Sequence, residues 1–360
     1  MGWATSAYPD LNRLAWGVRK DVALKEFERA VVSGRLLGGW RLEPTLATSL
    51  ARIPSMTDIR ERRFLHTFFA LHHLHGAVVE LGPYLGGTTR AIATGMERAG
   101  SSGPLISLDA FEWHSPHLRQ RLIDDAAGLM REVGIDPELV AEVHGGQWLR
   151  LFEQVHGRET YGHLVHPLVA HFPDRPEQPV PAGLVRSVEQ LDELSCIFVD
   201  GLKSWPSMVQ VLRLLLPRLS VGGFFILQDF SWYDCFWLPV LLGYLNQQFR
   251  LVHKVVNTAT FRCTAPVHDG VLAGFPDTPE GYGVEGITPF LRKWATAALD
   301  AGDEWGAIGH SMQLASAQAW FGSPDEAARL TEALRRLPLA DGHGWLFDAF
   351  DAGPVMTGAL

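Results

Sequence analysis

The chain has 360 residues, of which 47% are hydrophobic and 20% are charged, and its formal net charge is −9 at pH 7. This length supplies a core for one large domain with additions or for two modest domains. The negative charge argues against a nucleic acid or an anionic membrane as the main partner, because phosphates would be repelled.

No run of about 18 apolar residues suggests a membrane span, and the N-terminus lacks the basic-then-apolar pattern of a signal peptide. We therefore expect a cytoplasmic protein. The three cysteines, Cys196, Cys235 and Cys263, are widely spaced and odd in number, and two lie inside apolar runs. They are expected to be buried thiols and to form neither a disulfide framework nor a metal site.

The first part of the chain is expected to form helices. Apolar residues recur at three- and four-residue spacing over 21–37 and 56–74, and Thr57 and Asp58 are candidate caps for the second stretch. An N-terminal helical layer over residues 1–65 is the expected result.

Short apolar runs then alternate with helical patterns, which indicates an α/β fold with a mostly parallel sheet covered on both faces. The expected strands are 77–81, 104–108, 139–143, 195–199, 223–227, 249–256 and 258–263. A parallel crossover needs a dozen residues or more, so the last two runs must form an antiparallel hairpin. The sheet is therefore expected to end on a reversed strand.

Two further regions depart from this alternation. Residues 158–187 are rich in proline and histidine and are long for a connection within a compact domain, so we expect an insertion that acts as a lid or contacts substrate. Helical patterns over 288–301, 303–321 and 324–336 predict a C-terminal helical extension over 266–360. This extension is expected to cap the domain or to support self-association.

The stretch VVELGPYLGGTT, residues 78–89, places a carboxylate near the end of the first expected strand and three glycines directly after that strand. Ligands of parallel α/β sheets bind at the carboxyl ends of the strands, where such a turn leads into a helix. The spacing G-x-x-x-G and the absence of a following Lys-Ser/Thr pair make a pyrophosphate a poor candidate. Glu80 would repel a phosphate but can accept hydrogen bonds from an ammonium group, so a cationic ligand is favoured.

Together with an acid that ends the second strand in ISLDAF, the segment IFVDGLKSWPSMVQVLRLLLPRLSVGGFFILQDF and the terminal hairpin, this stretch resembles class I S-adenosylmethionine (SAM) methyltransferases. Within that superfamily the motifs resemble the branch of macrocin-type sugar O-methyltransferases and other bacterial tailoring enzymes. The similarity covers roughly residues 60–265. It implies a Rossmann-like sheet of seven strands with one antiparallel strand in a SAM-binding domain over 66–265, with the helical N- and C-terminal additions outside it.

Chemistry and resemblance together imply which residues contact SAM. Glu80 and the turn between Gly82 and Gly86 would hold the methionine part, and Asp109 would accept both ribose hydroxyls. A surface acid with a simple tight turn is the alternative for the first stretch, and a helix cap is the alternative for Asp109. The whole implied cofactor set is Glu80, Gly82, Tyr84, Gly86, Thr88, Thr89, Asp109, Phe111, Gln147 and Trp148.

Within this set, Thr88 and Thr89 are expected to cap the next helix and to contact the methionine part of SAM. Phe111 and Trp148 are expected to flank the adenine, and Gln147 is expected to supply an amide to its edge. These aromatic side chains follow the second expected strand and the stretch HGGQWL.

The resembled branch holds a divalent metal with acids after the fourth and fifth strands and uses a histidine as a base. Here Asp200 is retained, but the second acid is replaced by Leu202 and the histidine by Lys203. After the fifth strand the acid pair becomes Gln228 and Asp229. Since magnesium prefers carboxylate and substrate oxygens in octahedral order, we expect no metal site.

Asp200, Lys203 and Asp229 are therefore the expected acceptor-handling residues. Lys203 could act as a base with a lowered pKa or form an ion pair with one of the two aspartates. The aromatic residues around the fourth- and fifth-strand ends are candidates for an acceptor pocket, with a place in the core as the alternative. Those assigned to the acceptor are Trp205, Trp232 and Tyr233.

The expected function is methyl transfer from SAM to an oxygen or nitrogen of a small-molecule acceptor, such as a natural-product intermediate, by direct in-line attack and without a metal. One alternative is a cyclase or lyase that consumes SAM and releases methylthioadenosine, since aromatic faces can stabilise a sulfonium. A second alternative is a non-catalytic SAM-binding scaffold that works through its helical C-terminal part.

Overall fold

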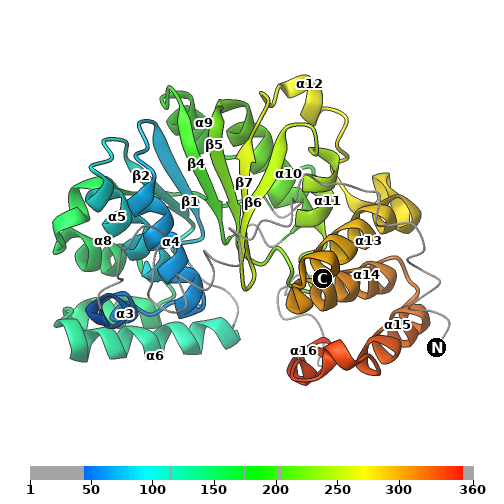
Figure 1. Ribbon diagram of the computed structural model, residues 1–360. Helices are drawn as coiled ribbons and strands as arrows, with labels where there is room; N and C mark the ends of the chain where they lie inside the picture. The colour runs from blue at the N-terminus through cyan, green and yellow to red at the C-terminus, as the bar shows by residue number, and fades with distance from the viewer. Residues whose placement is uncertain (1–43, 113–115, 174, 202–203, 352–360) are drawn as a thin grey trace.

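The computed structural model describes residues 44–112, 116–173, 175–201 and 204–351 (Figure 1). The helix expected over 21–37 lies outside these residues. The described chain begins with α3 (Pro44–Ala51) and α4 (Ile59–Leu71). As expected, Asp58 caps α4: its side chain accepts the Arg60 N–H in a capping box completed by Glu61.

The strands form one seven-stranded sheet in the order β3-β2-β1-β4-β5-β7-β6. Their bounds are β1 (Ala77–Leu81), β2 (Leu105–Asp109), β3 (Val165–Val169), β4 (Leu194–Val199), β5 (Leu219–Leu227), β6 (Phe249–Val255) and β7 (Thr258–Cys263). All neighbours pair in parallel except β7, which is antiparallel to both β5 and β6. The expectation of one reversed strand is confirmed. The expectation that this reversed strand lies at the edge of the sheet is wrong. The reversed strand β7 lies between β5 and β6, so β6 is the edge strand.

The strand expected over 139–143 is wrong, because these residues belong to α7 (Pro137–His144). Asp136 caps this helix and Pro137 occupies its first turn. Both are helix start signals, but the apolar run that follows them also fits a strand. The third strand is instead β3, which pairs only with β2 at the sheet edge. Pro167 within β3 argues against a strand in the sequence, because proline has no N–H to donate. An edge strand tolerates this missing N–H.

The insertion expected over 158–187 contains regular secondary structure. Its first half contains η2 (Thr160–Leu164) and β3, and its end contains α9 (Ala182–Glu189). The loop that connects β3 to α9 is held against α10 (Trp205–Leu215). Ser207 Oγ donates to Pro173 O over 2.6 Å, and Gln210 Nε2 donates to Arg175 O over 3.0 Å. The segment thus contributes β3 to the sheet, and its expected role as a lid or in substrate contact stays a prediction.

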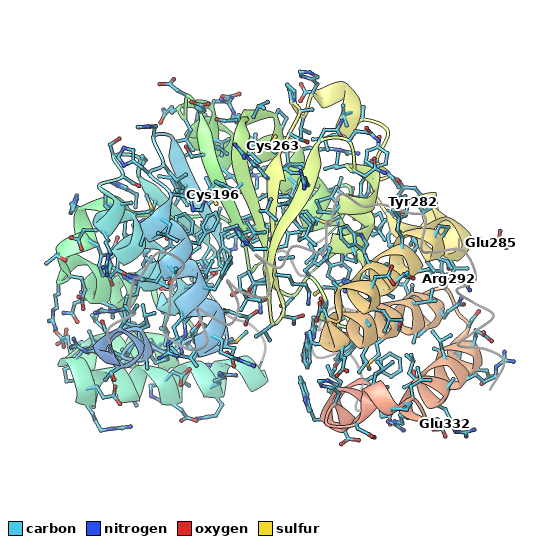
Figure 2. The ribbon with its side chains drawn as sticks, in the orientation of Figure 1. Cys196, Cys263, Tyr282, Glu285, Arg292 and Glu332 are labelled. Atoms are coloured by element: carbon cyan, nitrogen blue, oxygen red, sulfur yellow. The ribbon has the colours of Figure 1, made fainter. Side chains whose placement is uncertain are left out.

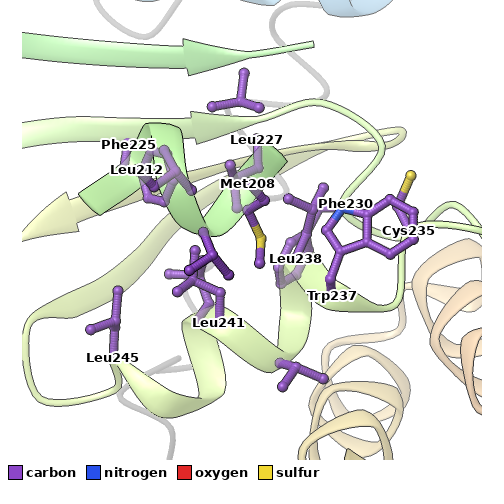
Figure 3. Close-up of a cluster of buried hydrophobic side chains, with 14 of the residues drawn as sticks. Met208, Leu212, Phe225, Leu227, Phe230, Cys235, Trp237, Leu238, Leu241 and Leu245 are labelled. Atoms are coloured by element: carbon purple, nitrogen blue, oxygen red, sulfur yellow. The ribbon is translucent and has the colours of Figure 1, made fainter. Parts of the chain in front are cut away.

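Helices cover both faces of the sheet, with α4 and α5 on one side and α10 and α11 on the other (Figure 1). Because side chains alternate along a strand, Val78 packs in the cluster with the first pair and Val79 in the cluster with the second. Figure 3 shows Met208 and Leu241 within this second cluster. The remaining helices of the sheet layer are α5 (Gly87–Ala99), α6 (Pro116–Val133), α8 (Leu149–Gly157), α10 (Trp205–Leu215), η3 (Leu216–Arg218) and α11 (Trp237–Tyr244).

The C-terminal helices agree with the sequence pattern. They are α12 (Asp269–Leu272), η4 (Pro279–Gly281), α13 (Gly283–Ala301), α14 (Glu304–Trp320), α15 (Pro324–Arg335), η5 (Pro338–Ala340) and α16 (Gly344–Asp351). The Trp294 indole on α13 donates to Pro239 O over 2.8 Å, which joins this part to α11. A Cβ at Gly309 would lie 2.0 Å from Ser231 O, so only glycine allows α14 to approach the segment after β5 so closely. The domain boundaries and self-association through these helices stay predictions.

All three cysteines are free and buried, as the sequence predicts. Figure 2 places Cys196 on β4 and Cys263 on β7. Across the described ranges, no helix is both long and apolar enough to cross a membrane.

Candidate active site

The segments that follow β1, β4 and β5 begin side by side at the carboxyl edge of the sheet. Gly82 N–H donates to Leu108 O over 2.9 Å, and Asp200 N–H donates to Leu81 O over 2.8 Å. Gln228 N–H likewise donates to Val199 O over 2.9 Å, one strand further along. The expected site residues of these segments therefore share one edge, where ligands of parallel sheets bind.

The glycines of the first turn are required by their protein neighbours. Gly82 has φ +82°, and a Cβ there would lie 2.6 Å from the Gly201 Cα. Gly86 has φ +92°, and a Cβ there would lie 1.8 Å from His156 Nε2. The turn therefore packs closely on the β4 loop and on α8, which holds its backbone in one position.

Tyr84 fixes the same turn from its middle, with φ +54°. Its hydroxyl donates to Asp125 Oδ2 over 2.9 Å, and its carbonyl accepts the Trp148 indole N–H over 3.1 Å. Helix α5 begins directly after the turn, with Gly86 at its N-cap and no side-chain cap. The expectation that Thr88 and Thr89 cap α5 is therefore wrong.

Those two threonines instead donate to Glu80, which is fully buried on β1. Thr88 Oγ1 lies 2.7 Å from Glu80 Oε1, and Thr89 Oγ1 lies 2.7 Å from Oε2. Ser107 Oγ on β2 also donates to Oε2, over 2.9 Å. Burial raises the pKa of the Glu80 carboxyl, and these three hydroxyl groups oppose the rise. Glu80 thus joins β1, β2 and α5 and is not a surface acid; its contact with an ammonium group stays a prediction.

Asp109 ends β2 as a half-buried carboxylate. Its Oδ1 accepts the Phe111 N–H over 2.8 Å in a turn where Phe111 has φ +50°. Burial raises the pKa of Asp109 to about 7, and the backbone N–H of Phe111 opposes this. Because α6 begins only at Pro116, the bond to Phe111 does not cap a helix.

The three residues expected at the adenine lie together next to this turn. Phe111 and Trp148 are each 2% exposed, and their ring centroids are 6.3 Å apart. Phe111 also packs on Phe152, at 5.2 Å between centroids. Gln147 is exposed and donates from Nε2 to Glu112 Oε1 over 3.1 Å. The two rings are therefore packed in the core, and their contacts with adenine stay predictions.

Asp200 and Asp229 are positioned by segments far away in the sequence. Asp200 Oδ2 accepts the Thr57 hydroxyl, which precedes α4, over 2.9 Å. Asp229 is 6% exposed, has φ +62°, and accepts from Asn257 Nδ2 over 3.3 Å. Leu202 and Lys203 lie outside the described residues, so the structure says nothing about the expected base.

Sequence reasoning missed Glu61 and Asn257. Glu61 Oε1 accepts the Asn257 N–H over 2.9 Å and the Thr258 hydroxyl over 2.9 Å. Burial raises the pKa of Glu61 to about 7, and the nearby Asp229 charge adds to the rise. The D-x-x-E spacing of a capping box marks Glu61 as a cap residue. No local pattern connects it to a hairpin turn 196 residues away.

The expected acceptor aromatics are mostly packed inside the protein. Trp205 is 2% exposed, donates from its indole to Pro276 O over 2.9 Å and stacks on Phe275 at 5.2 Å. Tyr233 is 1% exposed, and its hydroxyl donates to Ala349 O over 3.2 Å. Trp232 is half-buried. Contact of Trp205 or Tyr233 with an acceptor would require this packing to open.

Asp200, Asp229 and Gln228 are the described oxygen donors at the positions where the resembled branch holds a divalent metal. In the part of the chain that the structure describes, no group of three His, Cys, Asp or Glu side chains is arranged to hold one. Asp200 and Asp229 already accept hydrogen bonds from Thr57 and Asn257. Gln228 adds only a neutral oxygen, and the expectation of no metal site stays a prediction.

The strand order with a reversed β7, the glycine turn after β1 and the acid that ends β2 define the fold of class I methyltransferases. Residues 79–230 match the family model described as a methyltransferase domain, Methyltransf_24, over less than half of the chain. Residues 79–230 are therefore assigned to a methyltransferase domain. No match was found among curated protein sequences.

Several solved structures resemble the chain weakly. The O-methyltransferase NovP is 17% identical over 66% of this chain and 88% of its own, with a TM-score of 0.38. A putative O-methyltransferase from Klebsiella pneumoniae is 15% identical over 68% and 100%, with a TM-score of 0.37. The O-methyltransferase TomG from Streptomyces achromogenes, solved with SAM, is 13% identical over 73% and 96%, with a TM-score of 0.32. The assignment of residues 79–230 to a methyltransferase domain rests on the match to the family model.

Proposed function

We propose that this enzyme transfers a methyl group from SAM to an oxygen or nitrogen of a small-molecule acceptor, and that the acceptor is a natural-product intermediate. The observation that carries the proposal is Asp109. It is a half-buried carboxylate at the end of β2, in the matched domain and beside the strand that leads into the glycine turn. A carboxylate in this place offers two acceptor oxygens for a pair of ribose hydroxyls.

The proposed SAM site uses the turn from Gly82 to Gly86 for the methionine part and Asp109 for the ribose. Glu80 holds the start of α5 through Thr88 and Thr89, so it orients the turn even where it does not touch the ligand. When bound, SAM supplies an electrophilic methyl group on a sulfonium sulfur. The residues of this edge orient the acceptor toward that methyl group and exclude water from it.

Transfer then requires one bond to form and one to break. The acceptor oxygen or nitrogen bonds to the methyl carbon while the carbon–sulfur bond breaks, and the bonding pair stays on sulfur. The acceptor proton leaves to a nearby base or to water. Asp200 and Asp229 are the described candidates for holding the acceptor group, and Lys203 is proposed beside them from the sequence alone.

Asp109 provides the test of this SAM site. Asp109→Ala is expected to weaken SAM binding by about 2–4 kcal/mol, the scale of losing two hydrogen bonds to a charged group. Because burial raises the pKa of Asp109 to about 7, the carboxylate is lost as the pH falls through 7. The SAM affinity of the native protein should therefore decrease from pH 8 to pH 6, and calorimetry should show a flatter profile for Asp109→Asn. An unchanged SAM affinity in Asp109→Ala, with the fold intact, would contradict the assignment of Asp109 to the SAM site.

Activity is expected to be independent of divalent metal. Leu202 has no donor atom, Lys203 carries a positive charge, and Gln228 offers a neutral oxygen where the resembled branch has metal ligands. Turnover should survive exhaustive treatment with EDTA, and Lys203→Ala should reduce turnover more than chelation does. Loss of activity with EDTA and its recovery with added magnesium would instead identify Asp200 and Asp229 as metal ligands.

A further inference from the structure

A cavity of about 340 Å³ lies between β6, the segment after β5 and the helices α13 and α14. Its volume falls within the range of small-molecule sites. The described lining residues are Phe230, Leu251, Lys254, Trp294, Ala297, Ala298, Ala301, Gly302, Asp303, Glu304, Trp305, His310 and His343. Gly302 and Glu304 are exposed, so the cavity reaches the surface. All of these residues except Phe230 lie outside the matched methyltransferase segment.

Of the three charged residues that line this cavity, Lys254 and Asp303 form an ion pair and Glu304 is exposed. Lys254 Nζ lies 2.6 Å from Asp303 Oδ2 and also donates to Val256 O over 2.9 Å. Asp303 Oδ1 accepts the Gly306 N–H over 2.9 Å as the N-cap of α14. This pair therefore favours neither an anionic nor a cationic ligand, and the apolar walls set the main preference.

His310 also lines the cavity, and only one of its two ring nitrogens, Nδ1, makes a hydrogen bond among the described residues. Gln313 Nε2 lies 3.0 Å from Phe230 O and 2.8 Å from Trp232 O, and these carbonyls can only accept. The Gln313 amide nitrogen is thereby fixed, and its Oε1 faces His310 Nδ1 at 2.8 Å. His310 Nδ1 must then carry the proton and donate, which leaves Nε2 with a lone pair.

The neutral form of His310 is also the one that burial favours. Burial is the main cause that lowers the pKa of His310 to about 4; the Lys254 charge acts in the same direction, and the hydrogen bond with Gln313 and the Asp303 charge oppose it. The ring is 1% exposed and packs against Phe230, with centroids 5.1 Å apart. In the described residues no hydrogen bond is made by Nε2. A hydroxyl group on a ligand could provide one.

The cavity adjoins the end of β5, where the acceptor is proposed to react. Phe230 follows Asp229 directly in the sequence and forms one wall. On another wall, the Trp305 indole donates to Asn257 Oδ1 over 3.2 Å, and Asn257 Nδ2 donates to Asp229 Oδ1 over 3.3 Å. Trp305, which lines the cavity, therefore belongs to the hydrogen-bond network that positions Asp229.

We propose that this cavity binds the acceptor, and that the acceptor presents a flat aromatic ring with a hydroxyl group that donates to His310 Nε2. Trp294, Trp305 and Phe230 offer ring faces and edges to such a ligand. The helix α13 closes one side with small side chains, which leaves room for a planar body. This inference rests on the proposed function only in naming the ligand as the acceptor.

The test uses 4-ethylphenol and ethylbenzene as probes of the full-length protein, with binding followed by ligand-observed NMR. Ala297→Phe fills the cavity and is expected to weaken binding of both probes at least about tenfold. The matched control is Leu299→Phe, since Leu299 is 50% exposed on the same helix, and it should leave both affinities unchanged. If Ala297→Phe does not fold, Ala301→Phe at the end of α13 provides the same test.

A second variant tests the hydrogen bond. His310→Asn keeps a donor toward Gln313 and removes Nε2, so it should reduce the preference for 4-ethylphenol over ethylbenzene about two- to tenfold. SAM affinity, measured by calorimetry, should change by less than about twofold in every variant. Absence of 4-ethylphenol binding by the native protein up to about 5 mM, or equal binding by the filled variants, would overturn the cavity proposal. Failure of SAM binding alone would instead overturn the proposed function.

Discussion

Replacing Glu80 with alanine is expected to lower the free energy of unfolding by about 2–4 kcal/mol and to abolish measurable SAM binding. The carboxylate is fully buried and accepts hydrogen bonds from Thr88, Thr89 and Ser107. Alanine leaves these three hydroxyl groups without their acceptor and leaves a cavity between β1, β2 and α5. The glycine turn between β1 and α5 then loses the contact that orients it.

Two control variants show how much of the lost stability comes from the missing hydrogen-bond acceptor and how much from truncating a glutamate side chain. Glu80→Gln keeps one carbonyl oxygen for a threonine hydroxyl, so its loss of stability should be smaller than that of the alanine variant. Glu132→Ala makes the same truncation at an exposed position of α6 and should change the stability by less than about 0.5 kcal/mol. Denaturant unfolding gives the stabilities and calorimetry gives the affinities. Native-like values of both in Glu80→Ala would contradict the role assigned to this carboxylate.

Gln313→Leu is expected to lower the free energy of unfolding by about 2–4 kcal/mol and to reduce turnover strongly. Gln313 is fully buried on α14, and its amide holds the carbonyls of Phe230 and Trp232 after β5. Leucine has a similar volume but leaves these carbonyls and the His310 N–H buried without partners. Since Asp229 begins the same segment, its position is expected to loosen as well.

The matched control is Gln318→Leu, a half-buried position on the same helix. It should remain within about 0.5 kcal/mol of the native stability and keep native turnover. Unfolding by denaturant and the rate of S-adenosylhomocysteine formation are the two readouts. A Gln313→Leu variant as stable and active as Gln318→Leu would show that α14 does not support the segment after β5.

Much of the fold could be predicted because its signals are local. The Asp58 cap, the apolar period of α13 to α15 and the short apolar runs of most strands are all readable within a few residues. The errors arose where local signals conflict. Leu139–Val143 is apolar enough for a strand, but Asp136 and Pro137 begin a helix there. Val165–Val169 contains a proline, which only its place at the sheet edge permits.

The site could be predicted only as far as strand ends determine it. Because parallel strands end at one edge, the sequence is enough to bring Glu80, Asp109 and Asp200 there. It does not show that the Glu80 carboxylate accepts hydrogen bonds from protein hydroxyl groups. One of these groups, Ser107, belongs to another strand and is 27 residues away in the sequence. Gln313 lies 83 residues from the carbonyl that it holds, and no spacing rule connects them.

The central claim is that the chain transfers the methyl group of SAM to an acceptor. The most direct measurement incubates the purified protein with SAM carrying a deuterated methyl group, first alone and then with a cell extract, and identifies the adenosine product and labelled compounds by mass spectrometry. We expect S-adenosylhomocysteine together with an acceptor that has gained the deuterated methyl group. Release of methylthioadenosine, or tight SAM binding without either product across acceptor panels, would contradict the claim.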